Sequence, residues 1–106
     1  MTPPSVVLRA RARQDVDEAV ARCMDRAGSE VAIEFIDRLE EAFGHIADSP
    51  ASGSPRYGHE VNLPGLRSWP LRSDPYLVFY MAAAGSIDVW RVLHERRDIP
   101  AWLRAP

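Results

Sequence analysis

The alternation of apolar and polar residues near the start of the chain predicts a strand. Over residues 6–12, the apolar side chains of Val6, Leu8, Ala10 and Ala12 fall on one side, and those of Arg9 and Arg11 fall on the other. A period of two is typical of a strand with one buried face. We therefore expect this segment to be the first strand of a sheet, with both arginines exposed.

The following segment changes to helical spacing and predicts two helices joined by a very short turn. Apolar residues recur every three or four positions over residues 16–27 and again over 32–46. Gly28 is suited to end the first helix, and Ser29 is suited to cap the second. We expect the acidic residues from Asp15 onward to lie in the first helical turn, where the helix dipole favours them. The two helices should form an antiparallel hairpin.

The second half of the chain predicts a loop, three strands and a short terminal helix. Residues 51–64 are rich in Ser, Gly and Pro, a composition typical of a loop. Strand-like runs follow at about 65–72, 75–82 and 86–94. The tail at 97–103 has the pattern of a short helix or turn.

The order of these elements is β-α-α-β-β-β and favours an α+β fold. We expect one domain over residues 1–106, with the N-terminal strand and the helical hairpin packed on one face of a mainly antiparallel sheet. Pro70 has no N–H to donate to a neighbouring strand, so the strand that contains it should be an edge strand or be bulged there.

The last two strands are apolar on both faces, so both faces of the sheet should be covered. Tyr76, Val78 and Tyr80 share one face of their strand, and Leu77, Phe79 and Met81 share the other. Strict alternation in the next strand places Ile87, Val89, Arg91 and Leu93 opposite Asp88, Trp90, Val92 and His94. Two helices cover only one face, so the second should expose apolar surface to a partner. The alternative is that the 51–64 loop and the tail fold over it.

Composition excludes several classes of function. All thirteen basic residues are Arg, so no lysine is available as a base or a nucleophile. The net charge of −2 argues against bulk electrostatic binding of nucleic acid, although it is compatible with a local arginine patch. The single Cys23 suits a reducing cytoplasm, and no apolar run approaches the roughly 18 residues of a membrane span. With no histidine pair at ligand spacing and a single cysteine, we expect no metal site.

The late strands and the tail carry a more specific pattern. The run Pro-Tyr-Leu-Val-Phe-Tyr at 75–80 is followed by Val-Leu-His-Glu-Arg-Arg-Asp-Ile-Pro at 92–100. This succession resembles the ParE branch of the RelE/ParE toxin superfamily, and the resemblance extends over nearly the whole chain. It implies a RelE/ParE-like fold and a toxin of a type II toxin–antitoxin system.

The resemblance also implies a mechanism and partners. ParE toxins are expected to bind and poison DNA gyrase, with no cofactor and no catalytic residues of their own. A ParD-like antitoxin, folding across the toxin as an amphipathic helix, would neutralise the protein in a two-plus-two assembly. Candidate antitoxin contacts are Arg9, Arg11, Trp69, Tyr76, Tyr80 and Trp90. Candidate target contacts are Arg96, Arg97 and Trp102, although Trp102 could equally cap the core.

RelE-type relatives suggest an alternative, a ribosome-dependent mRNA endonuclease. Such a site needs a base, an acid and cations that hold the phosphate. The nearest candidates are Arg72, Arg91 and His94, with Arg67 and Glu95 beside them in the sequence. The absence of Lys, and of a Tyr after His94, argues against this function. We expect His94 instead to close its strand by hydrogen bonding to nearby backbone.

Overall fold

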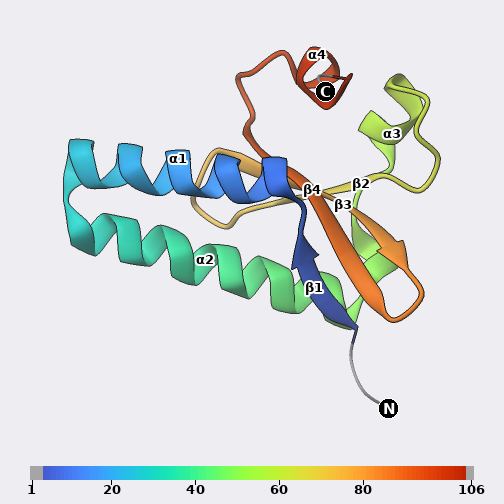
Figure 1. Cartoon of the computed structure of the whole chain (residues 1–106), viewed down its shortest axis with the longest axis horizontal. Helices are drawn as coiled ribbons and strands as arrows, with labels where there is room; N and C mark the ends of the chain where they lie inside the picture. The colour runs from blue at the N-terminus through green and yellow to red at the C-terminus, as the bar shows by residue number, and fades with distance from the viewer. Residues whose placement is uncertain (1–3, 105–106) are drawn as a thin grey trace.

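The chain folds in the predicted order, including the short terminal helix, with a 3-10 turn and a short helix added before the second strand. The computed structural model describes residues 4–104. Its elements are β1 (Ser5–Leu8), α1 (Ala10–Ala27), α2 (Ser29–Asp48), a 3-10 turn η1 (Pro50–Ser52), α3 (Arg56–Glu60), β2 (Arg67–Pro70), β3 (Tyr76–Ala83), β4 (Ser86–His94) and α4 (Ile99–Arg104). The two long helices lie side by side as a hairpin (Figure 1). The predicted α+β class is therefore confirmed.

The strands of residues 4–104 form one sheet in the order β1-β4-β3-β2. β3 pairs antiparallel with both β2 and β4, whereas β1 lies parallel to β4. β2 is thus an edge strand and ends at Pro70, which confirms the expectation for a residue without an N–H.

The prediction of one long first strand is wrong. β1 ends at Leu8, Arg9 is the N-cap residue, and α1 begins at Ala10, so Arg11 lies on a helix. Alanines spaced two apart fit a strand, but alanine also has the highest helix propensity. The packing decides between the two, because Ala12 is fully buried against the sheet as part of the helical stripe.

The helical hairpin turns at Gly28, as predicted. Gly28 adopts a φ of +90°, which is open to a residue without Cβ, and it caps both helices. Ser29 is the first residue of α2 and its side chain makes no capping hydrogen bond, so that expectation is wrong. The buried residues of the two helices are Ala12, Ala19, Ala32, Phe35, Leu39, Ala42 and Ile46. No helix within residues 4–104 has the length and apolar character needed to cross a membrane.

A bulge in the sheet changes which β4 side chains face the hairpin. Tyr80 pairs with Val89, and the preceding residue of β3 pairs with Arg91, so Trp90 is left without a partner opposite. The strict alternation expected for β4 therefore fails after this point. Val92, rather than Arg91, joins Val89 in the core beneath the helices.

The second face of the sheet is covered by the chain itself. α3, α4 and the segment before β2 close over a second core of Val61, Leu66, Phe79, Leu93, Ile99 and Leu103. The expectation of an exposed apolar face is therefore wrong, and the alternative, that the 51–64 segment and the tail fold over it, is confirmed. Residues 51–64 are not a plain loop, because they contain part of η1 and all of α3.

Tyr80 ties the 51–64 segment to the sheet. Its side chain is fully buried, and its hydroxyl donates to the carbonyl oxygen of Pro50 at 2.8 Å and accepts from the N–H of Gly53 at 3.1 Å. Burial raises the pKa of the Tyr80 phenol. A Cβ on Gly53 would lie 2.3 Å from the hydroxyl oxygen of Tyr80, so this close approach requires glycine.

Arg91 ties α4 to α1 and the sheet. Its guanidinium donates two hydrogen bonds to the carboxylate of Asp15, at 2.8 and 2.9 Å, and a third to the carbonyl oxygen of Trp102 at 2.9 Å. Asp15 also accepts from the N–H of Val92 at 3.0 Å. The expectation that Asp15 lies in the first turn of its helix is wrong, because α1 begins at Ala10. It is the buried partner of Arg91.

Candidate partner-binding groove

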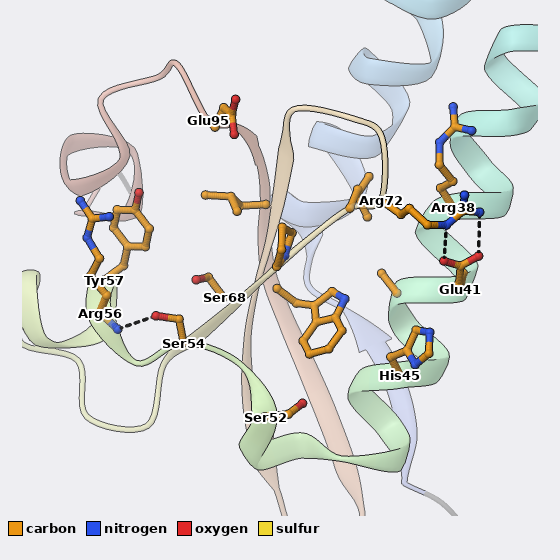
Figure 2. Close-up of a pocket in the computed structure, with 15 residues that line it drawn as sticks. Arg38, Glu41, His45, Ser52, Ser54, Arg56, Tyr57, Ser68, Arg72 and Glu95 are labelled. Carbon is orange, nitrogen blue, oxygen red and sulfur yellow. Dashed lines mark hydrogen bonds and ion pairs between the residues drawn. The ribbon is translucent and has the colours of Figure 1, made fainter.

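A groove of about 750 Å³ lies between α2 and the segment that contains η1 and α3, with β2 as its floor (Figure 2). It is lined by Arg38, Glu41, Ala42, His45, Ser52, Ser54, Arg56, Tyr57, Ser68, Trp69, Pro70, Leu71, Arg72, Leu77 and Glu95. The centre is apolar and the surrounding residues are charged, an arrangement typical of protein interfaces. The volume is within the roughly 300–1,000 Å³ typical of ligand sites.

The α2 wall of the groove is organised by arginine–carboxylate pairs. Arg72 makes a two-pronged contact with Glu41, at 3.0 and 3.1 Å, drawn as dashed lines in Figure 2. The Arg72 guanidinium lowers the pKa of Glu41, and Glu41 in turn raises the pKa of Arg72. Arg38 is paired with Asp74 of the β2–β3 connection. These pairs join α2 to the turn that follows β2.

Trp69 is the large apolar residue on the floor of the groove. Its ring stacks on that of His45, with centroids 5.9 Å apart and an interplanar angle of 24°. The neighbouring Ser68 exchanges two backbone hydrogen bonds with Ser54, both of 2.9 Å, and Pro70 offers no N–H. Because the edge of β2 is occupied or blocked in this way, a partner would be recognised here by side chains rather than by adding a strand.

The opposite wall is formed by α3. Tyr57 packs edge-on against Phe79 at a centroid distance of 5.4 Å, which fixes α3 to the sheet. The guanidinium of Arg56 lies 5.0 Å from the centroid of the Tyr57 ring and also contacts Glu60. α3 thus carries a cation on the wall of the groove opposite the glutamate of α2 (Figure 2).

The residues predicted to contact an antitoxin do not share one surface. Trp69 lies in the groove, and Tyr76 packs beside the same core beneath the hairpin. Trp90 packs against the second core, with the Arg9 guanidinium 4.5 Å from its ring centroid. Tyr80 is fully buried and is therefore not available as a surface contact.

Arg11 lies with Arg91 and Trp102 beside a further hollow, away from the groove lining. The early start of α1 places Arg11 on a helix, and Tyr80 and Trp90 pack against the two different cores of the sheet, which are the reasons for this dispersal.

The three nuclease candidates line three different hollows. Arg72 lies in the groove with Glu41, and Arg91 is buried against Asp15. His94 lies elsewhere, and its Nδ1 accepts a hydrogen bond from the backbone N–H of Arg96 at 3.1 Å. This contact with nearby backbone is the structural role expected for His94.

The other two candidates are also apart. Arg67 donates to the carbonyl oxygen of Gly53 at 2.7 Å, and Glu95 lines the groove, whereas His94 lines another hollow.

The residues predicted to contact a target lie together near the end of the described chain. The guanidinium of Arg97 is 4.1 Å from the centroid of the Trp102 ring, and that of Arg91 is 5.5 Å from it. Trp102 is half-buried against the second core, and Arg96 is exposed in the connection between β4 and α4.

Several groove residues were missed by reasoning from the sequence. None of Arg38, Glu41 and His45 was singled out as a candidate contact. Their spacing of three and four residues places them in one stripe, which is the signal that could have found them. Among residues 4–104, no group of three or more His, Cys, Asp or Glu side chains is arranged to hold a metal ion.

Comparison with known proteins defines the class. The sequence model of the family described as the ParE toxin of the type II toxin–antitoxin system parDE matches residues 6–99. The chain therefore belongs to the ParE toxin family.

Two relatives and one solved structure agree with this assignment. Toxin ParE1 of Mycobacterium tuberculosis, in strains CDC 1551 and H37Rv, is 32% identical over 94 residues, which cover 88% of this chain and 91% of the relative. A structure of the chromosomal ParDE system from P. aeruginosa has a TM-score of 0.73 at 18% identity, covering 86% of this chain and 95% of that one. That structural likeness shows that the fold is shared.

Proposed function

We propose that this ParE-family toxin inhibits bacterial growth in the cytoplasm by binding and poisoning DNA gyrase, without catalysis of its own. The observation that carries the proposal is the match of residues 6–99 to the ParE family, which covers both the sheet and the hairpin. Binding rather than chemistry is also favoured by the composition of the groove, where the arginines are paired with carboxylates.

The endonuclease alternative has little geometric support. Phosphate-binding cations must converge on the reacting group together with an acid and a base. Arg72 and Arg91 are instead each held by a carboxylate, and neither shares a hollow with His94. The arginine pairs would have to break before either could bind a phosphate.

We propose that a ParD-like antitoxin occupies the groove and neutralises the toxin, as part of a two-plus-two complex. An amphipathic segment fits this site, because Trp69 and Leu77 offer apolar contact while Arg56 and Glu41 offer charges of both signs on the two walls. Arg9, Arg11, Tyr76 and Trp90 would be contacted by parts of the antitoxin that continue beyond the groove.

The surface proposed to meet the target is formed by Arg96, Arg97 and Trp102. Arginine and tryptophan are the residue types most enriched where alanine substitution weakens binding. Because Arg97 lies over the ring of Trp102, the two side chains hold one another in position. This surface lies outside the groove lining, so the target and the part of the antitoxin that occupies the groove would bind different places.

The target is tested with purified gyrase, ATP and supercoiled plasmid, in the presence and absence of the toxin. We expect linear, protein-linked DNA to accumulate only when the toxin is present. Unchanged supercoiling with folded, antitoxin-free toxin would exclude gyrase poisoning. The next assay would then be ribosome-dependent cleavage of mRNA by the native chain and by His94→Ala.

The separation of the two surfaces is tested with a pair of matched variants, Trp69→Ala and Trp102→Ala. We expect Trp69→Ala to weaken antitoxin binding by about 30-fold, the loss of an interface hot spot, and to leave gyrase poisoning intact. Trp102→Ala should do the reverse. Thermal unfolding checks that both variants are folded. Loss of both activities in either folded variant would show that the surfaces overlap.

A further inference from the structure

A second, smaller hollow brings together four arginines from two distant parts of the sequence. It has a volume of about 260 Å³ and is lined by Arg22, Arg26, Tyr76, His94, Arg96 and Arg97. The first two arginines lie one turn apart on α1, and the last two follow β4. Figure 1 shows α1 and the connection from β4 to α4, the two segments that supply these arginines.

The arginines of this hollow differ from the five arginines of the described residues that form salt bridges. Within the described residues, the salt bridges involve Arg9, Arg38, Arg56, Arg72 and Arg91. None of the four arginines of the hollow forms a salt bridge in that part of the chain, and no carboxylate lines it. Like charges brought together destabilise a fold, and a bound anion would offset this repulsion.

The other two residues of the hollow are also set to donate hydrogen bonds. The Tyr76 hydroxyl accepts from Arg22 at 3.3 Å, which leaves its own proton available. The Nδ1 atom of His94 accepts from the N–H of Arg96, so the ring proton of the neutral imidazole is on Nε2. Every side chain that lines the hollow therefore carries a proton to donate.

This arrangement favours a phosphate over a carboxylate. Guanidinium groups from α1 and from the 96–97 segment approach the hollow from separate elements, and a tetrahedral phosphate can accept hydrogen bonds from several directions. A carboxylate has only two oxygens in one plane. Arg97 is moreover held in place by the ring of Trp102.

The hollow is suited to a backbone phosphate rather than to an unstacked base. Single strands are bound through free aromatic faces on which bases stack. Here Tyr76 packs edge-to-face with His94, at a centroid distance of 5.2 Å, and with Phe35 at the same distance. These contacts leave no stacking platform, which favours duplex DNA, whose bases remain paired.

We propose that this hollow binds a phosphodiester group in the backbone of duplex DNA. The net charge of −2 predicts that the protein as a whole binds DNA weakly. The net charge does not reveal that four arginines lie together at this hollow. The site does not depend on gyrase being the target, because it is defined by phosphate chemistry alone.

The test measures fluorescence anisotropy of a labelled short DNA duplex titrated with the full chain, between about 50 and 200 mM salt. The hollow variant carries Arg22→Gln and Arg26→Gln, which leave the proposed target surface untouched. The matched control carries Arg13→Gln and Arg104→Gln, two exposed arginines outside the hollow, with the same change in net charge.

We expect the hollow variant to bind about tenfold more weakly for each arginine removed, and the control to change little. The slope of log affinity against log salt should fall by about 0.9 for each lost phosphate contact. Thermal unfolding checks the fold, and Arg96→Gln with Arg97→Gln provides a second hollow variant should the first be unfolded.

Three outcomes would overturn the proposal. The first is no binding of the duplex by the native chain, and the second is an equal loss in the hollow and control variants. The third is tighter binding of an oligo-glutamate peptide than of the duplex, with that binding abolished in the hollow variant. That result would assign the hollow to an acidic protein segment.

Discussion

The two faces of the sheet are closed in different ways. One is covered by α1 and α2, helices of 18 and 20 residues whose buried positions recur at helical spacing. The other is covered by α3 and α4, of five and six residues, which are too short to be stable by themselves. The first face is closed by a repeating pattern, whereas the second depends on a few specific contacts between residues far apart in the sequence.

Two buried polar side chains of the sheet hold the segments that cover it. Tyr80, in the core beneath the hairpin, holds the segment that leaves α2, and Arg91 holds α4 through the carbonyl oxygen of Trp102. Buried polar groups of this kind stabilise a fold only while all their partners are in place. The difference between the faces can therefore be tested by removing one contact at a time.

The largest effect is expected for Arg91→Ala. This change leaves the buried carboxylate of Asp15 without its guanidinium, and breaking a buried pair in this way costs about 3–5 kcal/mol. Urea unfolding measures the loss. The exposed Arg13→Ala is the control and should stay within about 0.5 kcal/mol of the native chain. Equal midpoints for the two variants would show that Arg91 does not anchor α4.

A smaller effect is expected for Leu103→Ala on the second face. The loss should be about 2 kcal/mol, at the low end for a buried leucine, because α4 is short and can settle into the vacated space. Hydrogen exchange should quicken in α4 and leave α2 protected. The matched Leu39→Ala in α2 should lower protection throughout. If both leucines gave the same exchange pattern, the two faces would not differ in cooperativity.

Tyr80→Phe should cost about 1–2 kcal/mol, because the carbonyl of Pro50 and the N–H of Gly53 lose their partner. The native chain should also lose stability above about pH 10, the ordinary pKa of tyrosine. Burial raises the folded pKa of Tyr80, so the unfolded chain releases this proton first as the pH rises. Unfolding midpoints across this range should show the decline in the native chain and a smaller one in Tyr80→Phe.

The smallest effect on stability is expected for Arg72→Gln. Its partner Glu41 is exposed, and solvent screens such pairs. Because Arg72 lowers the pKa of Glu41, the contribution of this pair is present above the usual glutamate pKa and is lost as the pH falls through the lowered value. Melting temperatures of the variant and the native chain should therefore converge in acid. A large loss at neutral pH would show that the groove wall supports the fold.

Much of the fold was readable in the sequence, and the exceptions have specific causes. Gly28 marked the hairpin turn because few other residues accept its backbone conformation. Pro70 marked the edge strand because it has no N–H. The start of α1 was missed because alanine fits both a helix and a buried strand position. The faces of the sheet on which the β4 side chains after Trp90 lie were predicted wrongly, because a bulge leaves no local signal in the sequence.

The site was predicted less completely than the fold. Trp69 was found as a candidate contact, and it lies on the floor of the groove, but its neighbours on α2 were not found. Tyr80 was expected at a partner surface and is buried. Aromatic residues on a strand carry no mark of the face they will occupy, and that face is set by what the rest of the chain packs against it.

The sequence by itself determined the order of elements, the helical hairpin and the ParE family, because periodicity, glycine and proline act locally and motifs lie in continuous runs. The tertiary structure decided what covers the second face and where the arginines lie. Asp15 and Arg91 are far apart in the chain but form a buried pair, and Arg22 meets Arg96 only across a folded hollow. Such contacts depend on distance in space, which the spacing of residues along a chain does not specify.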